Sequence, residues 1–197
     1  MTRHQERPAG KTTRVARSVV LAGLVWTSAS TGAGTATEPV VPAAVQATLM
    51  VRVLEYDRAL KSWSGGRLTV GVVARHAGGA AELEQALSGR EAQGVPIKVA
   101  VHAYTGAESL RAWIERNGVQ LVYLAPDAAG DSAAAVAVAG ARKLPVLVAS
   151  RAQFQDGATV ALVLRDGKPH ILVNLGASRS AGMDLDPKLL QLSEVIR

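Results

Sequence analysis

The stretch that decides the fold is Ala158–Ile196, ATVALVLRDGKPHILVNLGASRSAGMDLDPKLLQLSEVI. Two apolar runs, 160–164 and 170–175, flank the pair Asp166-Gly167. Asp-Gly is favoured in two-residue hairpin turns because both residues can adopt positive φ, so we predict a β-hairpin. Apolar residues then recur mostly three or four positions apart, which predicts a short helix and a closing amphipathic helix that reaches Ile196. No catalytic group is evident in this stretch.

Strands and helices alternate ahead of the hairpin. Apolar runs predict strands at Arg67–Ala74, Ile97–His102, Val119–Leu124 and Leu144–Ala149. Helices are expected from Pro42 to a stop at Gly65-Gly66, at Ala80–Leu87, at Gly106–Arg116, and from an Asp131 or Ser132 cap to Ala141. This alternation predicts an α/β fold of three layers, a mainly parallel sheet flanked by helices, with the antiparallel hairpin and closing helix at its end.

The first 36 residues have the features of a secretory signal peptide. Five Lys and Arg against one Glu give this segment a net charge of +4, and an apolar run, Ser18–Thr27, follows. About ten apolar residues are too few to cross a hydrocarbon core of ~30 Å. We expect cleavage after Gly34-Thr35-Ala36 and export to the periplasm. The expected organisation is a signal peptide at 1–36, a linker at 37–44 and a domain at 45–197, with an uncleaved anchor or a basic arm as alternatives.

Charge and cysteine content exclude several classes of function. The chain carries +6, so only +2 remains outside the leader. That balance, without interleaved aromatic residues, disfavours nucleic acid as a partner. The chain has no cysteine, which removes disulfides, thiolate catalysis and cysteine-based metal sites.

One candidate ligand site follows from the strand order. Open α/β sheets bind ligands beyond the carboxyl ends of their strands. The corresponding loops are Arg75–Gly79, Ala103–Gly106, Ala125–Asp131 and Ser150–Gln155, and the candidate residues are His76, Gly78, Gly79 and Asp127. His76-Ala-Gly-Gly follows the first strand, as a phosphate loop would, but it lacks the Gly-x-Gly-x-x-Gly pattern, which favours a simple turn.

Other polar residues have structural explanations. Asp186 precedes Pro187 and is expected to cap the helix there, which is favoured over a metal or acid–base role with Asp184. Ser178-Arg179-Ser180 lacks the spacing of a nucleophile elbow. Asp127 and Asp131 are expected to serve as turn and cap residues. The four histidines are dispersed, so we expect no catalytic residue, no metal site and no cofactor.

The C-terminal block ILVNLGASRSAGMDLDPKLLQLSEVI resembles the closing signature of the YfiR family of periplasmic regulators. The positions that match this signature are Asn174, Leu175, Ala181, Gly182, Leu185, Leu189, Leu190 and Leu192. The similarity covers roughly residues 43–197. Some members carry disulfides that this cysteine-free chain lacks, and its EYDRALKSW segment differs from the aromatic-rich ending of the first helix in better-known members.

The resemblance implies a non-enzymatic, exported regulator with a homodimeric form. Its partner would be the external domain of an inner-membrane signalling protein such as a diguanylate cyclase, with only an indirect link to cyclic-di-GMP. A second hypothesis is a periplasmic small-molecule-binding protein that uses the strand-end loops, and a third is an exported enzyme. The first predicts an exposed apolar patch, and the second a concave pocket with polar groups.

Overall fold

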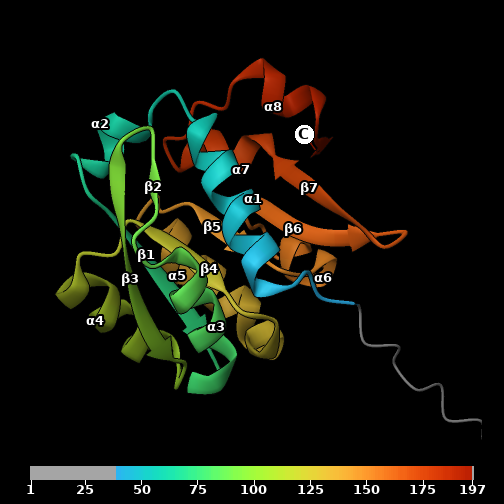
Figure 1. Cartoon of the computed structure of the whole chain (residues 1–197). Coiled ribbons are helices and arrows are strands. Elements are labelled where there is room, and N and C mark those ends of the chain that lie inside the picture. Colours follow the sequence, from blue (N-terminus) through green and yellow to red (C-terminus); the bar gives the residue numbers. More distant parts are fainter. Residues whose placement is uncertain (1–38, 197) are drawn as a thin grey trace, which may run out of the picture. The chain divides into compact units, whose positions relative to one another are not determined.

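The computed structural model describes residues 39–196, which form an α/β domain built on one sheet of eight strands (Figure 1). The strands are β1 Leu68–Ala74, β2 Glu91–Ala92, β3 Val95–Ala103, β4 Leu121–Leu124, β5 Val146–Val148, β6 Val160–Arg165, β7 Lys168–Asn174 and β8 Glu194–Ile196. Their order in the sheet is β2-β3-β1-β4-β5-β6-β7-β8. The strands from β3 to β6 run parallel, and the β2–β3 and β6–β7 pairs are antiparallel. The predicted mainly parallel sheet is confirmed.

Helices cover both faces of this sheet. They are α1 Ala43–Glu55, α2 Leu60–Ser64, α3 Ala77–Leu87, α4 Ala107–Asn117, the 3₁₀ helix η1 Pro126–Asp131, α5 Ser132–Gly140, α6 Arg151–Gln155, α7 Leu175–Ser180 and α8 Pro187–Gln191. Apolar residues of α1 and α3 pack with Val70 and Val72 of β1 in one cluster. Those of α4 and α5 pack with Val73 in a second cluster on the opposite face. Because successive strand residues point to opposite faces, one strand serves both clusters.

The hairpin between β6 and β7 forms as predicted. Asp166 and Gly167 have φ angles of 52° and 72°, and Arg165 pairs with Lys168 across the turn. Two residues with positive φ match the twist of the flanking strands, which is why Asp-Gly is favoured here. A short helix, α7, follows the hairpin, also as predicted.

The closing helix is shorter than its sequence pattern predicted. Helix α8 ends at Gln191, and residues 194–196 form β8, which pairs in parallel with β7. Glu194 of β8 lies within ion-pair distance of Arg151 (3.2 Å) and Arg165 (3.3 Å), two residues from distant parts of the chain. The prediction of a helix to Ile196 was therefore wrong. It relied on the spacing of apolar residues within the segment, which does not indicate contacts with β7, Arg151 or Arg165.

The N-terminal helix is also different from the prediction, because it breaks after Glu55. Asp57 is fully buried, and its Oδ1 accepts hydrogen bonds from the backbone N–H groups of Ala59 (3.0 Å) and Asp184 (2.9 Å). Its Oδ2 accepts one from the indole Nε1 of Trp63 at 2.8 Å. The backbone N–H of Arg58 donates to the carbonyl of Asp184 at 2.9 Å and not to a carbonyl one turn back in the helix, so α1 and α2 are separate.

Several shorter elements were not predicted. Helix α3 begins at Ala77, so Gly78 and Gly79 belong to its first turn and not to a loop before it. The two-residue strand β2 pairs with β3, and α6 follows β5. The predicted signal peptide and its cleavage position lie outside the described residues. Within 39–196, no helix combines the length and apolar character needed to span a bilayer.

Candidate functional site

The candidate ligand site lies where the chain changes direction along the sheet. From β1 the chain passes through α3 to β3 on one side, and later through α4 to β4 on the other side of β1. The loops that follow β1 and β4 therefore lead away in opposite directions, which leaves a crevice at the carboxyl ends of these two strands. His76 follows β1 and Asp127 follows β4, so the sheet brings these two predicted residues together.

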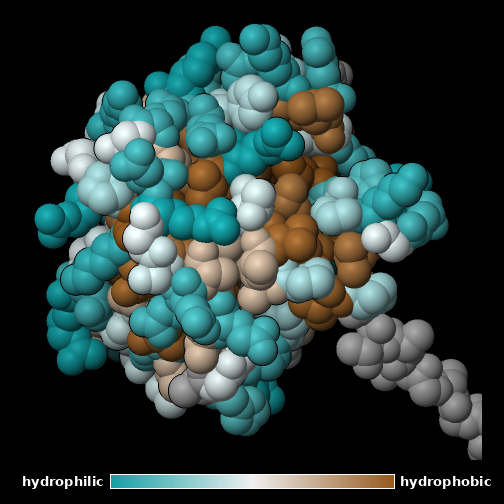
Figure 2. Space-filling model, viewed as in Figure 1, coloured by the Kyte–Doolittle hydropathy of each residue, from teal (hydrophilic) through white to brown (hydrophobic). Residues whose placement is uncertain are grey.

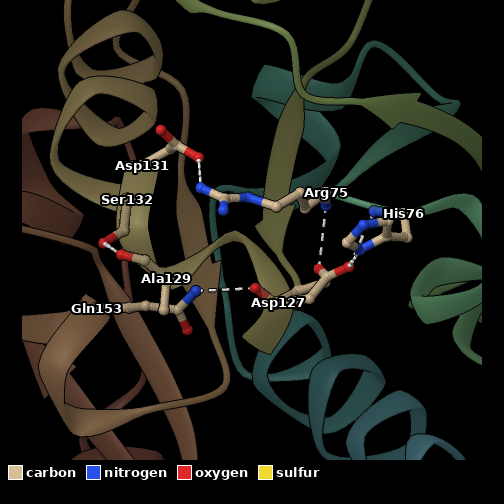
Figure 3. A network of polar contacts seen from close by, with 8 residues as sticks. Arg75, His76, Asp127, Ala129, Asp131, Ser132 and Gln153 are labelled. Carbon is tan, nitrogen blue, oxygen red and sulfur yellow. Dashed lines mark hydrogen bonds and ion pairs between the residues drawn. The ribbon is translucent and has the colours of Figure 1, made fainter.

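Asp127 occupies this crevice with its own carboxylate. Its Oδ1 accepts a hydrogen bond from the backbone N–H of Arg75 at 3.1 Å, and its Oδ2 accepts one from that of His76 at 2.9 Å (Figure 3). The Nδ1 atom of His76 lies 3.5 Å from the same Oδ2. These amide groups lie just before α3, where a phosphate loop would hold its anion. An internal carboxylate therefore takes the place that an anionic ligand would need.

Gly79 makes room for this carboxylate. A Cβ atom at Gly79 would lie 3.1 Å from Asp127 Oδ2, whereas one at Gly78 would meet no atom within 4 Å. Gly79 therefore belongs to the site with His76 and Asp127, and Gly78 lies exposed beside it. Three of the four predicted mouth residues are in contact or close approach, and their contacts are with one another.

Asp131 and Ser132 do not cap α5, contrary to the prediction. Asp131 Oδ2 pairs with Arg75 Nη2 at 2.5 Å, and this contact raises the pKa of the Arg75 guanidinium (Figure 3). The Ser132 hydroxyl donates to the carbonyl of Ala129 at 2.7 Å and contacts Asp156 at 2.5 Å. The Asp131 side chain thus pairs with Arg75, and the Ser132 hydroxyl contacts Ala129 and Asp156. Neither side chain accepts a hydrogen bond from the first amides of α5.

Gln153 is a buried member of the site that sequence reasoning missed. Its Nε2 donates to the carbonyl of Ala125 at 2.9 Å, the one contact of Gln153 that Figure 3 draws. Its Oε1 accepts from the N–H of Ala149 at 3.3 Å. The residue is fully buried, and Ser150 caps its helix. The polar atoms of a buried glutamine side chain need hydrogen-bond partners. Here the bond from Gln153 to the carbonyl of Ala125 connects α6 to the end of β4. A lone glutamine carries no sequence signal for this role.

A cleft of about 240 Å³ opens beside Asp127, between the start of α1, the start of α3 and the end of β4. Its lining includes Pro42, Gln46, Gly79, Glu82, Tyr123 and Pro126. The Tyr123 hydroxyl donates to Gln46 Oε1, and Gln46 Nε2 donates to the carbonyl of Val41 at 2.6 Å. Burial raises the pKa of Tyr123, so its hydroxyl stays neutral at physiological pH. The cleft thus has a fixed polar floor.

Other candidate residues have structural roles. Asp186 Oδ1 accepts the N–H of Lys188 at 2.8 Å and caps α8, as predicted. Asp184 pairs with Arg58 at 2.7 Å. The buried Ser178 hydroxyl donates to the carbonyl of Thr159 at 3.3 Å, which binds it to the core. His102 stacks on Trp113, with ring centroids 4.8 Å apart.

The described residues also fall short of the needs of a metal site. Across residues 39–196, no group of three or more His, Asp, Glu or Cys side chains could hold a metal ion.

The residues of the C-terminal signature lie mostly inside the fold. Asn174 Oδ1 accepts the N–H of Ala177 at 2.9 Å and caps α7. Leu189 is fully buried, and Ala181 and Leu185 are nearly so. Gly182 has a φ of 82°, a conformation that favours glycine. Two signature residues, Gly182 and Leu192, are exposed, and Leu192 is exposed at 68%.

The sequence profile of the YfiR/HmsC-like family matches residues 43–194. The chain therefore belongs to the YfiR/HmsC-like family. The matched region begins with α1 and ends in β8, so it includes both segments that Asp57 joins. No sequence among curated proteins matches the chain.

Solved structures share the fold at low sequence identity. The ABC domain in complex with L-Trp from Streptococcus pneumonia has a TM-score of 0.55 and 11% identity, with 73% of this chain and 62% of that chain covered. A conserved domain protein from Vibrio cholerae O1 biovar El Tor has a TM-score of 0.57 and 14% identity, with 79% and 60% covered. The ligand-free, open structure of CD0873, a substrate binding protein with adhesive properties from Clostridium difficile, has a TM-score of 0.50 and 16% identity, with 71% and 57% covered. The chain thus spans about 60% of the length of these proteins, and the likeness shows the fold alone.

Proposed function

We propose that this protein is an exported, non-enzymatic regulator that binds the periplasmic domain of an inner-membrane signalling protein. The observation that carries this proposal is the family match over residues 43–194, which supports a periplasmic regulator. Export would depend on residues 1–36 acting as a cleaved signal peptide.

The mechanism would be a shift of a conformational equilibrium. A regulator that binds one state of a membrane sensor more tightly favours that state, by no more than the difference in its two affinities. If the sensor is a diguanylate cyclase, the link to cyclic-di-GMP would be indirect, since the regulator and the nucleotide lie on opposite sides of the membrane. A homodimer is compatible with this mechanism and is part of the proposal.

The C-terminal edge of the sheet offers a docking surface for this partner. Among the large apolar side chains of residues 39–196, those exposed are Val40, Leu192 and Ile196, at 41%, 68% and 42%. Leu192 precedes β8 and Ile196 is its last residue, and among the described strands β8 is the one at this edge of the sheet. Figure 2 shows apolar surface around α1 and the β6–β7 hairpin, with a further group beside α8. Exposed apolar side chains beside an open strand edge favour a protein partner.

Charged residues border this edge. Glu194 of β8 pairs with Arg151 and Arg165, and these contacts lower the pKa of its carboxyl group. The Arg165 side chain is 60% exposed. Apolar residues with a polar border are the usual composition of a protein–protein interface. We call Leu192, Ile196 and β8 the C-terminal edge.

Crosslinked capture from native membranes tests this function. The tagged, exported protein is crosslinked in cells, purified, and its partners are identified by mass spectrometry. The proposal expects enrichment of one membrane sensor with a periplasmic domain, and a copy without residues 1–36 should capture none of it. Recovery of the bait alone, with export and crosslinking confirmed, would contradict a stable partner.

A second candidate function is the binding of a small molecule at the strand ends. The cleft of about 240 Å³ beside Asp127 supports it, because it lies at the point where open α/β sheets bind ligands. The two functions are compatible, since a ligand could bias the state that meets the partner. Membrane capture tests the first function, and ligand titration tests the second.

A further inference from the structure

We propose that the cleft beside Asp127 binds a small organic cation, a primary amine with a compact apolar body. This inference rests on the second candidate function, the strand-end ligand site. It adds the charge and chemical class of the ligand.

The charge lining the cleft is negative. Glu82 lies in the lining on the first turns of α3, its side chain is exposed, and it forms no ion pair with another described residue. Among the described residues, no Lys or Arg belongs to the cleft lining. Arg75, which directly follows β1, is paired with Asp131 at 2.5 Å. A cationic ligand would therefore meet an uncompensated carboxylate.

Asp127 adds to this preference by excluding anions. Its carboxylate lies against Gly79, which is part of the cleft lining, and it already accepts the two backbone N–H groups before α3. Asp127 does not itself line the cleft, but an anionic ligand that reached the start of α3 would find these amides occupied. The position that favours phosphate in related folds is thus closed to anions in this one.

The walls of the cleft determine the size and the apolar character of the ligand. Pro42, Leu83 and Pro126 provide rigid or apolar surface, and the buried pair Tyr123 and Gln46 forms the floor. The Tyr123 hydroxyl donates to Gln46, which leaves its oxygen able to accept a hydrogen bond. An ammonium group offers three donors and no acceptor, so it suits the exposed carboxylate of Glu82. A volume of about 240 Å³ limits the body to roughly one ring.

Three probes of the same shape test this inference. Benzylamine hydrochloride, benzyl alcohol and sodium benzoate share one ring and differ in charge. Each is titrated into the isotope-labelled protein at pH 8, where an unperturbed histidine is neutral, and amide shifts are followed by NMR. We expect benzylamine to shift the amides of Gly79 and Glu82 and to bind at least tenfold more tightly than benzyl alcohol, with no saturable shift from benzoate.

Two variants locate the site. Glu82→Gln should weaken benzylamine at least fivefold, whereas Glu84→Gln, an exposed position on the same helix outside the cleft lining, should leave its affinity unchanged. Equal or tighter binding of the alcohol or the benzoate would overturn the choice of a cation while leaving a strand-end ligand site in place. Absence of any saturable shift at 10 mM of all three probes would overturn both. Neither result bears on the membrane partner, so the regulator is tested separately.

Discussion

The buried carboxylate of Asp57 accepts a hydrogen bond from the backbone N–H of Asp184 at 2.9 Å, and these two residues lie 127 positions apart. The same carboxylate accepts from Trp63 Nε1 and from the N–H of Ala59. Asp57 also pairs with Leu185 through a backbone bridge. One side chain therefore joins the first helices of the family domain to its C-terminal segment.

Replacing Asp57 should destabilise the fold strongly. In Asp57→Ala, three buried or half-buried donors lose their acceptor, and unsatisfied buried donors cost about 1–3 kcal/mol each. We expect a loss of about 3 kcal/mol or more in the free energy of unfolding, measured with urea. Asp184→Ala is the control, because it removes only the exposed pair with Arg58 and keeps the backbone N–H that Asp57 uses. A similar stability for both variants would contradict this role.

Removing the Asp127 carboxylate should both destabilise the fold and open an anion site. Asp127→Ala leaves the N–H groups of Arg75 and His76 without their acceptor, which should cost about 1 kcal/mol, as for a lost helix cap. The free amides before α3 should then bind sulfate, so this salt should raise the Tm of the variant more than that of the wild type. An identical response of both proteins to sulfate would show that Asp127 does not block an anion.

Gly71 should not tolerate a larger residue. A Cβ atom there would lie 2.8 Å from Val119 Cγ1 and 2.9 Å from two ring atoms of Trp113. Overpacking of a close-packed core costs about 1–3 kcal/mol, so Gly71→Ala should lower the free energy of unfolding by that amount. Gly140→Ala is the matched control, since a Cβ there meets no atom within 4 Å, and its stability should be unchanged or higher. Equal stabilities of the two variants would contradict the packing argument.

His102 should make the fold more sensitive to acid. Burial lowers its pKa in the folded state, and the charge of Arg116 adds to this effect. The unfolded chain therefore binds a proton first as pH falls below about 6.5, so stability decreases over that range and stays reduced below the folded pKa. Compared with His102→Gln, the wild type should lose more Tm between pH 8 and pH 5. Parallel Tm curves for the two proteins would contradict the shift.

Local sequence signals predicted the features that depend on neighbouring residues. The Asp166-Gly167 turn needs two positive φ angles, and the Asp186 cap needs only the amides that follow it. Strand–helix alternation predicted the layers for a similar reason, because each helix must bury one face on the sheet. The location of His76, Gly79 and Asp127 was predicted, because the carboxyl ends of the strands in a parallel sheet meet at one edge. Their contacts with one another were not.

Long-range contacts account for what could not be predicted. The break after α1 depends on Asp57 reaching Asp184, and β8 depends on the pairing of Glu194 with Arg151 and Arg165. Asp127 was expected as a turn residue, yet it accepts amides 52 and 51 positions away. Partners of this kind are determined by the folded chain, so a pattern within one segment does not indicate them.

The most direct test of the regulator is its binding to the purified periplasmic domain of the captured sensor, measured by calorimetry. The account predicts saturable binding with a Kd of about 10 μM or tighter, within the range of specific protein complexes. Leu192→Glu with Ile196→Glu should weaken it at least tenfold, since each places a charge on the C-terminal edge, while Ala112→Glu at an exposed position of α4 should not. Absence of binding at 100 μM of both folded proteins would contradict the regulator, and full affinity in the double variant would contradict the C-terminal edge.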